Sequence, residues 1–452
     1  MHIRHVSAAF LVLGSTFVAA QAPAAGGAVA PAPAAPVAQV AGPAAADAPV
    51  SPLAAAYPNM PTSWPDPDET KGGINLPALL NAPLVLEGLK KVQAVVPAAI
   101  LALPTSKQLV LGSGDVTYPG GAAAQAANCH QPAGCFRTTA TAYYQPDITA
   151  CPAANTWGLT YDDGPTAAPD SPNSADLRGQ LMAMNQQKAT FFVAGSPGFY
   201  QPAELKNIYD AGHEIAVHTW THAALTSLTN AQIVAEILYT EAWIVRTLGV
   251  KPVMFRPPFG DVDDRVRGII GALGYKNVMW LLSRDTQDTT DITSDAVVAS
   301  VKTWFTPQPG FIALEHNITP KTTNTSIQVL KSIQAAGAAF PLKMMPVGVC
   351  LGIAPYVGGN ATVAPATASS SAAAVPSAAS TLAPITSTQV VQVIATQKPA
   401  SAVATPIVAS TRSPATASQP AQVFQSGASA TGTKPAAWAA AGALLAGFFY
   451  SA

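Results

Sequence analysis

Between residues 155 and 350 the chain alternates short apolar runs, rich in β-branched and aromatic residues, with longer segments of helical periodicity. Strands that alternate with helices predict a parallel sheet, because a crossover helix returns the chain to the edge from which it started. The runs predicted as strands are 157–161, 189–194, 214–218, 252–256, 277–282, 311–316 and 344–350. Units repeated in this way indicate a closed or nearly closed barrel, so the expected fold class is α/β with a distorted (β/α)7-type barrel.

The helical segments between these runs have apolar residues spaced three or four apart. The clearest is 230–248, in which Ile233, Ile237 and Ile244 recur on one face. The other predicted helices are 81–96, 176–187, 264–273, 294–305 and 326–336.

Composition separates this core from the rest of the chain. The 452 residues carry only 10% charged residues and include 41 prolines, whereas soluble domains are typically about 25% charged. Tails rich in Ala, Pro, Ser and Thr cannot bury a varied apolar surface and are predicted to be disordered. A net charge of −1 excludes an electrostatic grip on nucleic acid. The expected parts are a low-complexity segment (21–56), an N-terminal extension that packs on the barrel (57–154), the barrel domain (155–350) and a stalk (351–425).

Both ends of the chain have the pattern of processing signals. Residues 1–20 combine a short polar start with an apolar stretch and small residues before a cleavage point, which predicts a secretory signal peptide. Residues 426–452 combine small residues, a polar spacer and an apolar tail, which predicts a GPI attachment signal with Ser426 or Gly427 as the site. Either apolar stretch is short for a membrane span. We therefore expect a protein of the secretory pathway, GPI-anchored at the plasma membrane, located in the cell wall, or both.

The chain has four cysteines, Cys129, Cys135, Cys151 and Cys350. An even number in a secreted chain favours disulfides, although sequence alone leaves three pairings open. A Cys129–Cys135 bond would close a small loop, and a Cys151–Cys350 bond would join the two ends of the barrel. The spacing of a zinc-thiolate site is absent.

Polar residues lie where predicted strands end, which is where (β/α) barrels place their chemistry. Asp162 and Asp163 precede a Gly-Pro pair, and His218 and His222 stand four residues apart at a strand end that we expect to turn into a helix. Two imidazoles at that spacing can bind one metal ion. Alternatively, the acids belong to an ordinary turn and the histidines are incidental surface residues.

Two further motifs end later strands. Arg256 precedes two prolines that stiffen its turn, so it would be held rigidly and could grip a carboxylate. His316, in the sequence Leu314-Glu315-His316-Asn317, could titrate near neutral pH and donate a proton. A solvated arginine and a structural histidine are the alternatives.

Taken in order along the chain, these motifs resemble the polysaccharide deacetylase family (carbohydrate esterase family 4, the NodB homology domain) over about residues 155 to 348. With the terminal signals and the stalk, the whole chain is most similar to the fungal GPI-anchored chitin deacetylases of that family. The resemblance implies a hydrolase that removes N-acetyl groups from chitin, or another N-acetylglucosamine polymer, to give chitosan and acetate.

The resemblance also implies a role for each site residue. Asp163, His218 and His222 would bind a divalent metal, usually Zn²⁺ with Co²⁺ as the alternative, and Asp162 would be the general base. Arg256 would orient Asp162, His316 would be the general acid, and Asp288 would tune His316. The backbone N–H of Phe259 would stabilise the oxyanion, and Leu314 would contact the acetyl methyl group.

The chain departs from the family pattern at two places. Thr289 replaces a tryptophan after Asp288, and Asn317 replaces the acid that often follows the histidine. Asn317, Asn324 and Asn360 lie in sequons for N-glycosylation. These departures motivate an alternative, an inactive wall-anchored protein that binds polysaccharide. A deacetylase or esterase acting on another acetylated polysaccharide is the third interpretation.

Overall fold

A computed structural model of the chain describes residues 57–66 and 72–359. The predicted signal peptide, the low-complexity segment 21–56, the stalk beyond residue 359 and the GPI signal with Ser426 and Gly427 all lie outside the described residues, as does Asn360.

Two parallel sheets form the centre of the described region. One consists of β4 (Thr160–Asp162), β5 (Thr190–Val193), β6 (Glu214–Val217), β7 (Met254–Phe255) and β8 (Lys276–Asn277), in that order. The other has the order β10 (Lys343–Met345), β3 (Thr156–Gly158) and β9 (Phe311–Ile312). Every strand pair in the two sheets is parallel. The α/β fold class predicted from the alternation is therefore confirmed.

Backbone hydrogen bonds connect the two sheets. Strands β3 and β4 form one extended segment that is interrupted at Leu159. The first part, β3, pairs with β10 and β9, whereas the second part, β4, pairs with β5. Beyond β9, His316 forms a parallel bridge with Asp162, and Leu314 forms another with Asp285. The chain after β9 thus lies between β4 and the chain after β8, and these isolated bridges link the two sheets.

The barrel helices follow the strands in the expected alternation. They are α6 (Ser174–Ala183), α7 (Gly195–Tyr200), α8 (Pro202–Asp210), α9 (Asn230–Leu248), α10 (Asp264–Ala272), α11 (Ser294–Lys302), α12 (Pro320–Ala336) and α13 (Val347–Leu351). Helix α9 has the bounds predicted from its periodicity. A capping box between Thr229 and Gln232 begins it, and Gly249, in the left-handed conformation, ends it.

Several predicted boundaries were wrong, since the strands expected over 277–282 and 311–316 end at Asn277 and Ile312, and the helices expected over 176–187 and 294–305 end at Ala183 and Lys302. Two further errors have a local cause. The helix expected from residue 326 begins six residues earlier, at Pro320, because the proline occupies the first turn and Thr319 caps the helix. The strand expected over 344–350 ends at Met345, and the following residues form α13, so Cys350 lies in a helix rather than in the last strand. Pro346 separates the two elements, since it lacks the N–H that would continue the ladder.

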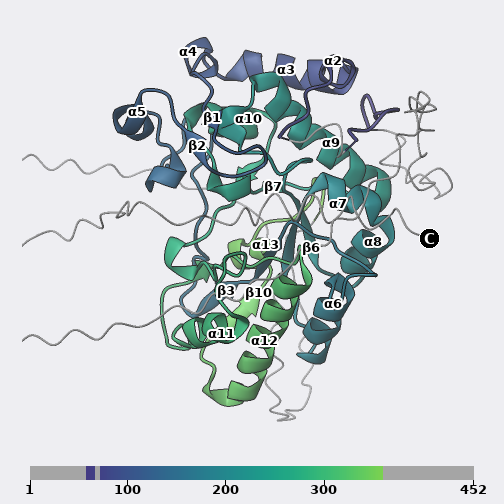
Figure 1. The fold of residues 1–452 in the computed structure, drawn as a ribbon, viewed down its shortest axis with the longest axis vertical. Helices are drawn as coiled ribbons and strands as arrows, with labels where there is room; N and C mark the ends of the chain where they lie inside the picture. Colours follow the sequence, from purple (N-terminus) through teal and green to yellow (C-terminus); the bar gives the residue numbers. More distant parts are fainter. Residues whose placement is uncertain (1–56, 67–71, 360–452) are drawn as a thin grey trace, which may run out of the picture. The chain divides into compact units, whose positions relative to one another are not determined.

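The N-terminal extension contains α2 (Pro77–Leu80), α3 (Pro83–Val95), α4 (Ala98–Leu101), α5 (Gly121–Ala127) and a two-stranded antiparallel sheet of β1 (Lys107–Gln108) and β2 (Val116–Thr117). Helix α3 packs against α9 and α10 (Figure 1). The packing is close at Gly88, where a side chain would collide with Val234 and Leu238 of α9. Short 3-10 turns complete the described elements: η1 (Gln131–Ala133), η2 (Leu225–Ser227), η3 (Pro258–Gly260), η4 (Leu282–Arg284) and η5 (Gly337–Ala339).

Two disulfides close the described chain on itself. Cys129 pairs with Cys135, six residues away, and Cys151 pairs with Cys350 across 199 residues. Of the pairings that the sequence left open, this one joins the start of the barrel to its last helix. The core beside the second disulfide consists of Phe192, Ala216, Met254, Val278, Ile312 and Val347. Among the described residues, no helix combines the length and the apolar character needed to cross a bilayer.

Candidate metal centre and active site

The side chains singled out by the sequence motifs meet at one edge of the barrel. Asp162 is the last residue of β4 and Asp163 follows it, while His218 directly follows β6 and Arg256 directly follows β7. His316 joins them through its bridge with Asp162. Because the strands are parallel, their carboxyl ends lie at the same edge, and residues far apart in sequence come within bonding distance there.

Asp163, His218 and His222 form a group that fits a divalent metal ion. Oδ1 of Asp163 lies 3.1 Å from Nε2 of His218 and 3.0 Å from Nε2 of His222, and one ligand atom from each residue falls within 4.8 Å of the others. Zinc bonds of about 2.1 Å that meet at angles of about 90–110° place ligand atoms roughly 3.0–3.4 Å apart. Oδ1 of Asp163 is buried and makes no hydrogen bond within the described chain. Its lone pairs are therefore directed at a place where a cation would sit.

The His218 ring is oriented by its second nitrogen. Nδ1 of His218 lies 2.8 Å from the backbone oxygen of Arg256. Since that oxygen only accepts, Nδ1 carries the proton and Nε2 keeps its lone pair free for a metal. The ring of His222 packs edge-on against Phe259 at 4.6 Å.

The two imidazoles converge for a different reason from the one expected. We predicted that the strand would turn into a helix and bring the histidines onto one helical face. Instead, residues 218–224 form a loop, and Thr219 and His222 have left-handed φ angles of 64° and 58°. The loop conformation, not helical spacing, directs both rings toward Asp163.

Asp162 faces the same place but is held by an arginine. Nη1 of Arg256 donates to Oδ1 of Asp162 at 2.7 Å and to the hydroxyl of Thr160 at 2.8 Å. The guanidinium is fully buried, and its other nitrogens donate to the backbone oxygens of Val278 and Met279. Burial lowers the pKa of Arg256, and the Asp162 carboxylate opposes that shift. Arg256 thus fixes one oxygen of Asp162, whose Oδ2 lies 3.9 Å from Nε2 of His218.

Asp163 is kept ionised by its neighbours. Burial alone would raise the pKa of Asp163, but the imidazoles of His222 and His218 lower it well below its usual value. A carboxylate that stays charged in a buried position is the donor type that divalent metals prefer alongside neutral imidazoles.

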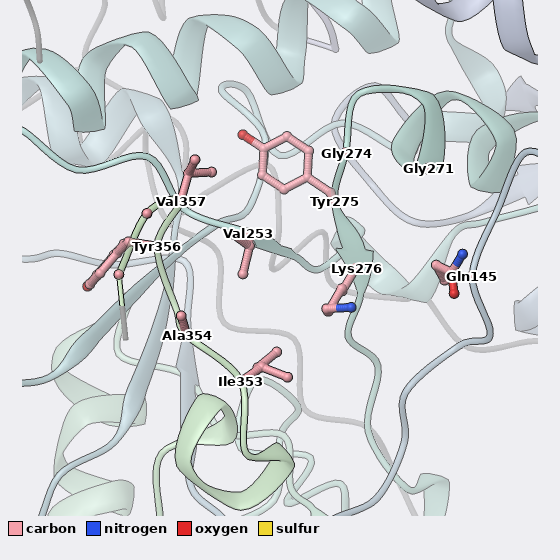
Figure 2. Close-up of a pocket in the computed structure, with 12 residues that line it drawn as sticks. Gln145, Val253, Gly271, Gly274, Tyr275, Lys276, Ile353, Ala354, Tyr356 and Val357 are labelled. Carbon is pink, nitrogen blue, oxygen red and sulfur yellow. The ribbon is translucent and has the colours of Figure 1, made fainter. Parts of the chain in front are cut away.

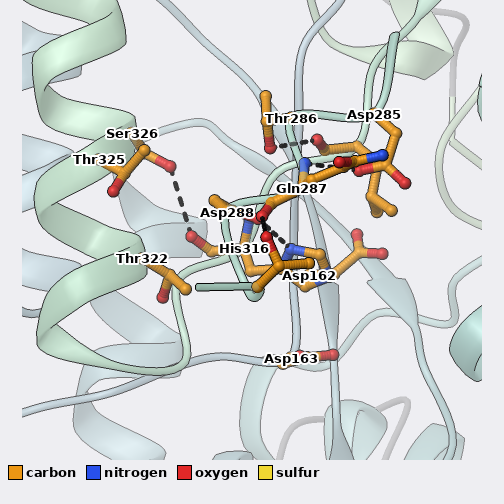
Figure 3. Close-up of polar contacts among 12 residues, drawn as sticks. Asp162, Asp163, Asp285, Thr286, Gln287, Asp288, His316, Thr322, Thr325 and Ser326 are labelled. Atoms are coloured by element: carbon orange, nitrogen blue, oxygen red, sulfur yellow. Dashed lines mark hydrogen bonds and ion pairs between the residues drawn. The ribbon is translucent and has the colours of Figure 1, made fainter. Parts of the chain in front are cut away.

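Another histidine–carboxylate pair, His316 and Asp288, lies beside Asp162 (Figure 3). Oδ1 of Asp288 lies 2.7 Å from Nδ1 of His316, and Oδ2 accepts the backbone N–H of His316 at 2.9 Å. Burial alone would lower the pKa of His316, but the Asp288 carboxylate raises it to about 10. The imidazole is therefore protonated at neutral pH.

Phe259 contacts the ring of His222, and Leu314 lies on the segment that carries His316. Phe259 lies in η3 with a left-handed φ of 59°. It is packed against Gly114 of the extension, where a Cβ would come within 2.6 Å of the ring. Leu314 is buried and precedes His316 by two residues on the same segment.

The two departures from the family pattern have different outcomes. Asn317 is fully buried, donates from Nδ2 to Ser174 at 2.9 Å and accepts the N–H of Gly164 at 3.3 Å. A glycan on Asn317 is incompatible with this arrangement, so that predicted site was wrong. Asn317 instead holds the turn after Asp163. Asn324 lies half-buried in α12, and its glycosylation stays a prediction. Thr289 leaves the Asp288–His316 pair intact.

Some residues that shape the site were given no role by the sequence motifs. Thr160 shares Nη1 of Arg256 with Asp162, and Glu236 of α9 accepts hydrogen bonds from the loop between the two histidines. Both lie in ordinary strand or helix patterns, so only their spatial neighbours distinguish them.

A cavity of about 470 Å³ lies away from this group, between the amino ends of β7 and β8 and the C-terminal segment of the described chain (Figure 2). Val253, Tyr275, Lys276 and residues 353–359 line it. None of the residues of the metal-binding group faces it. Its place at the amino edge of the strands separates it from the chemistry of the carboxyl edge.

Comparisons with known proteins agree with the geometry. A family model for polysaccharide deacetylase matches residues 149–278, a range that ends before Asp288 and His316. Chitin deacetylase 1 of Cryptococcus neoformans var. grubii is 38% identical over 226 residues, which cover 46% of this chain and 47% of that protein. Chitin deacetylase 1 of Saccharomyces cerevisiae is 32% identical over 218 residues, covering 47% of this chain and 65% of that protein.

The chain spans about half the length of the first curated relatives that it matches, 47% and 43%. Among solved structures, the chitin deacetylase of Colletotrichum lindemuthianum aligns with a TM-score of 0.39 and 26% identity, covering 46% of this chain and 94% of that one. The matched family range contains the strand ends that carry Asp163, His218 and Arg256. Residues 149–278 therefore match the polysaccharide deacetylase family, and the chain is similar to chitin deacetylases of fungi.

Proposed function

We propose that this protein hydrolyses the N-acetyl groups of chitin, or of a related N-acetylglucosamine polymer, to give chitosan and acetate, with Zn²⁺ as its metal and Co²⁺ as a substitute. The observation that carries the proposal is the convergence of Asp163, His218 and His222 beside Asp162, a second carboxylate that Arg256 holds in place. The family and the names of the relatives support the choice of substrate.

Asp163, His218 and His222 would hold the metal and leave positions open, as catalytic sites require. When bound, a divalent cation acidifies water and polarises an amide carbonyl. The proton transfers and the binding of the acetyl group are assigned to residues of the chain. Asp162, with Oδ1 fixed by Arg256, accepts the proton of the attacking water through its other oxygen.

The reaction forms a C–O bond to the acetyl carbon and breaks its C–N bond. The N–H of Phe259 would donate to the oxygen that becomes negative in the transition state. His316, protonated through its pair with Asp288, would donate a proton to the departing amine, which is a poor leaving group until protonated. Leu314 would contact the acetyl methyl group.

The test is acetate release from chitin oligomers before and after treatment with a chelator, followed by addition of Zn²⁺ or Co²⁺. We expect release to stop on chelation and to return with the metal. Acetylxylan and peptidoglycan fragments, assayed in parallel, identify the polymer. Release that persists fully after the metal is removed would contradict the proposal, and polymer binding without release would favour the inactive alternative.

His218→Ala should abolish release. His213→Asn provides a matched control, because His213 is also buried but lies at the amino end of β6, where its Nδ1 accepts the N–H of Ala189 at 3.2 Å. Asparagine keeps an acceptor for that bond, so this variant should retain activity.

The predicted terminal signals support a location at the cell surface. The proposed anchor at Ser426 or Gly427 is tested by treating intact cells with a phospholipase that cleaves GPI. Release of the full domain into the medium is expected, and retention by both membrane and wall fractions would contradict the anchor.

A further inference from the structure

The loop that carries His218 and His222 has a strained backbone, although one hydrogen bond within it joins the N–H of His222 to the hydroxyl of Thr219 at 3.1 Å. Thr219 and His222 adopt left-handed φ angles of 64° and 58°, a conformation that is strained for residues with a Cβ. The surrounding structure must therefore over-determine the loop, and its contacts identify which residues do so.

Glu236 of α9 binds the loop from behind. Its Oε2 accepts the backbone N–H groups of Trp220 and Thr221 at 2.9 and 2.8 Å, and its Oε1 accepts the Thr221 hydroxyl at 2.7 Å. Oε1 also accepts the N–H of Ile74, from the N-terminal extension, at 3.0 Å. The side chain is fully buried. Both carboxylate oxygens are thus used by backbone and hydroxyl donors.

Trp220, in the middle of the loop, is held by the extension as well. Its Nε1 donates to the backbone oxygen of Pro65 at 3.1 Å. The ring of Trp64 stacks on it, with centroids 5.9 Å apart and an interplanar angle of 19°. Trp64 also packs edge-on against Trp243 of α9 at 5.1 Å. The extension therefore contacts Trp220 both at its ring and at its indole nitrogen.

The extension is itself fastened to α9. Tyr57 donates to Oε1 of Glu241 at 2.5 Å, and Lys251 donates to the same oxygen at 2.8 Å. Ile74 is fully buried. The contacts on the loop thus come from a segment with its own anchor, outside the range matched by the family model.

We infer that the N-terminal extension is a working part of the candidate metal centre. Glu236 and Trp220 position the His218–His222 loop for metal binding, and residues 57–66 and 72–74 complete both contacts. Glu236 is a positioning residue and not a metal ligand. The inference rests on one part of the proposed function, namely that Asp163, His218 and His222 bind a metal ion.

The first test measures zinc affinity of the metal-free protein by competition with a chromophoric chelator. Glu236→Gln keeps the shape of the side chain, but its amide nitrogen cannot accept the loop N–H groups. Changes in residues that orient metal ligands typically weaken metal binding about 10- to 100-fold, and we expect a loss in that range. Glu241→Gln is the matched control, since Glu241 is almost equally buried on the same helix and does not contact the loop, while the oxygen of glutamine can still accept the hydroxyl of Tyr57 and keep the extension in place. This variant should lower thermal stability and leave zinc affinity unchanged.

The second test isolates the contact with the extension. Trp220→Phe removes the hydrogen bond to Pro65, which should weaken zinc binding roughly 2- to 10-fold. Trp243→Phe is its control, because Nε1 of Trp243 has no hydrogen-bond partner within the described part of the chain. If Glu236→Gln does not fold, Trp220→Phe and Trp243→Phe still test the inference.

The inference is overturned if folded Glu236→Gln binds zinc with wild-type affinity. If Glu236→Gln does not fold, wild-type zinc affinity in Trp220→Phe overturns it. An equal loss in the matched control also overturns it, because the effect would then be one of general stability. A wild-type protein that binds zinc but releases no acetate refutes the proposed reaction and leaves this inference standing. A wild-type protein that binds no metal refutes both.

Discussion

Two buried aspartates, Asp147 and Asp163, show how structural and chemical use of a charge differ in one molecule. Oδ1 of Asp147 accepts from Nε of Arg267 at 2.9 Å and from Asn277 at 2.8 Å. Oδ2 accepts from Nη2 of Arg267 at 2.8 Å and from the backbone N–H of Arg137 at 2.9 Å. Every oxygen has donors, so this carboxylate has no capacity left for a ligand.

Asp163 is nearly as buried, yet its Oδ1 has two imidazole nitrogens at about 3 Å and no hydrogen bond within the described chain. An incompletely satisfied buried carboxylate lowers the stability of a fold unless a ligand completes it. A buried carboxylate whose oxygens all accept hydrogen bonds therefore has a structural role. A buried carboxylate with an oxygen that accepts none, close to two imidazole nitrogens, is a candidate ligand-binding group.

The largest effect should follow from Asp163→Asn. Loss of the anionic ligand should reduce acetate release by roughly a thousandfold or more, because the metal is no longer held. The free energy of unfolding of the metal-free protein should change little, since no donor loses its partner. Zinc titration and chemical denaturation measure the two effects. A strong loss of stability with zinc binding intact would place Asp163 in the structural class with Asp147.

Asp162→Asn should separate the two adjacent acids. A general base contributes roughly 10²- to 10⁴-fold to the rate, so kcat should fall in that range, while zinc affinity stays near the wild-type value because Asp163 still binds the metal. Parallel measurement of kcat and the zinc dissociation constant checks this division of roles. Equal loss of both quantities would show that Asp162 is a ligand.

Asp147→Asn should lower the free energy of unfolding and leave catalysis unchanged. It removes the closer of the two carboxylates that pair with the buried Arg267 guanidinium, at 2.8 Å against 3.7 Å for Asp264, and breaking a buried ion pair typically costs about 3–5 kcal/mol. Denaturation should show that loss of unfolding free energy, while kcat per folded molecule and zinc affinity remain unchanged. A change in zinc affinity at full folding would break the contrast between the two aspartates.

The smallest effect concerns pH. Since His316 must be protonated to act as an acid, kcat should decline on the alkaline side as it loses its proton. Asp288→Asn removes the charge that raises the pKa of His316 to about 10, so this decline should move to lower pH by at least about 1 unit. Profiles of kcat against pH for both proteins measure the shift, and coincident alkaline limbs would exclude His316 as the acid.

The same pair predicts how stability depends on pH. The pKa of His316 is higher in the folded chain than the value of about 6.5 for an exposed imidazole. Its pairing with Asp288 therefore stabilises the fold fully below about pH 6.5, and this stabilisation is lost as the pH rises toward 10. Denaturation of the metal-free protein across that window should show the decline in the wild type and a smaller one in Asp288→Asn.

Much of the fold was predictable because its signals are local. The alternation of apolar runs and amphipathic segments identified the parallel strands, and periodicity with its caps identified α9 to the residue. The errors occurred where local signals compete. The run over 344–350 is apolar enough for a strand, but a proline at 346 divides it into β10 and α13.

The candidate site was predictable in its residue types and not in its geometry. The motifs were enough to predict that two acids, two histidines and an arginine stand at strand ends, and parallel strands bring those ends to one edge. Three features could be seen only in the folded chain: the histidine loop has left-handed residues and is not helical, Asn317 is buried, and Trp64, Pro65 and Ile74 contact the loop or its support. These outcomes depend on contacts between residues more than 100 positions apart, and no local pattern of side chains encodes which distant group will meet them.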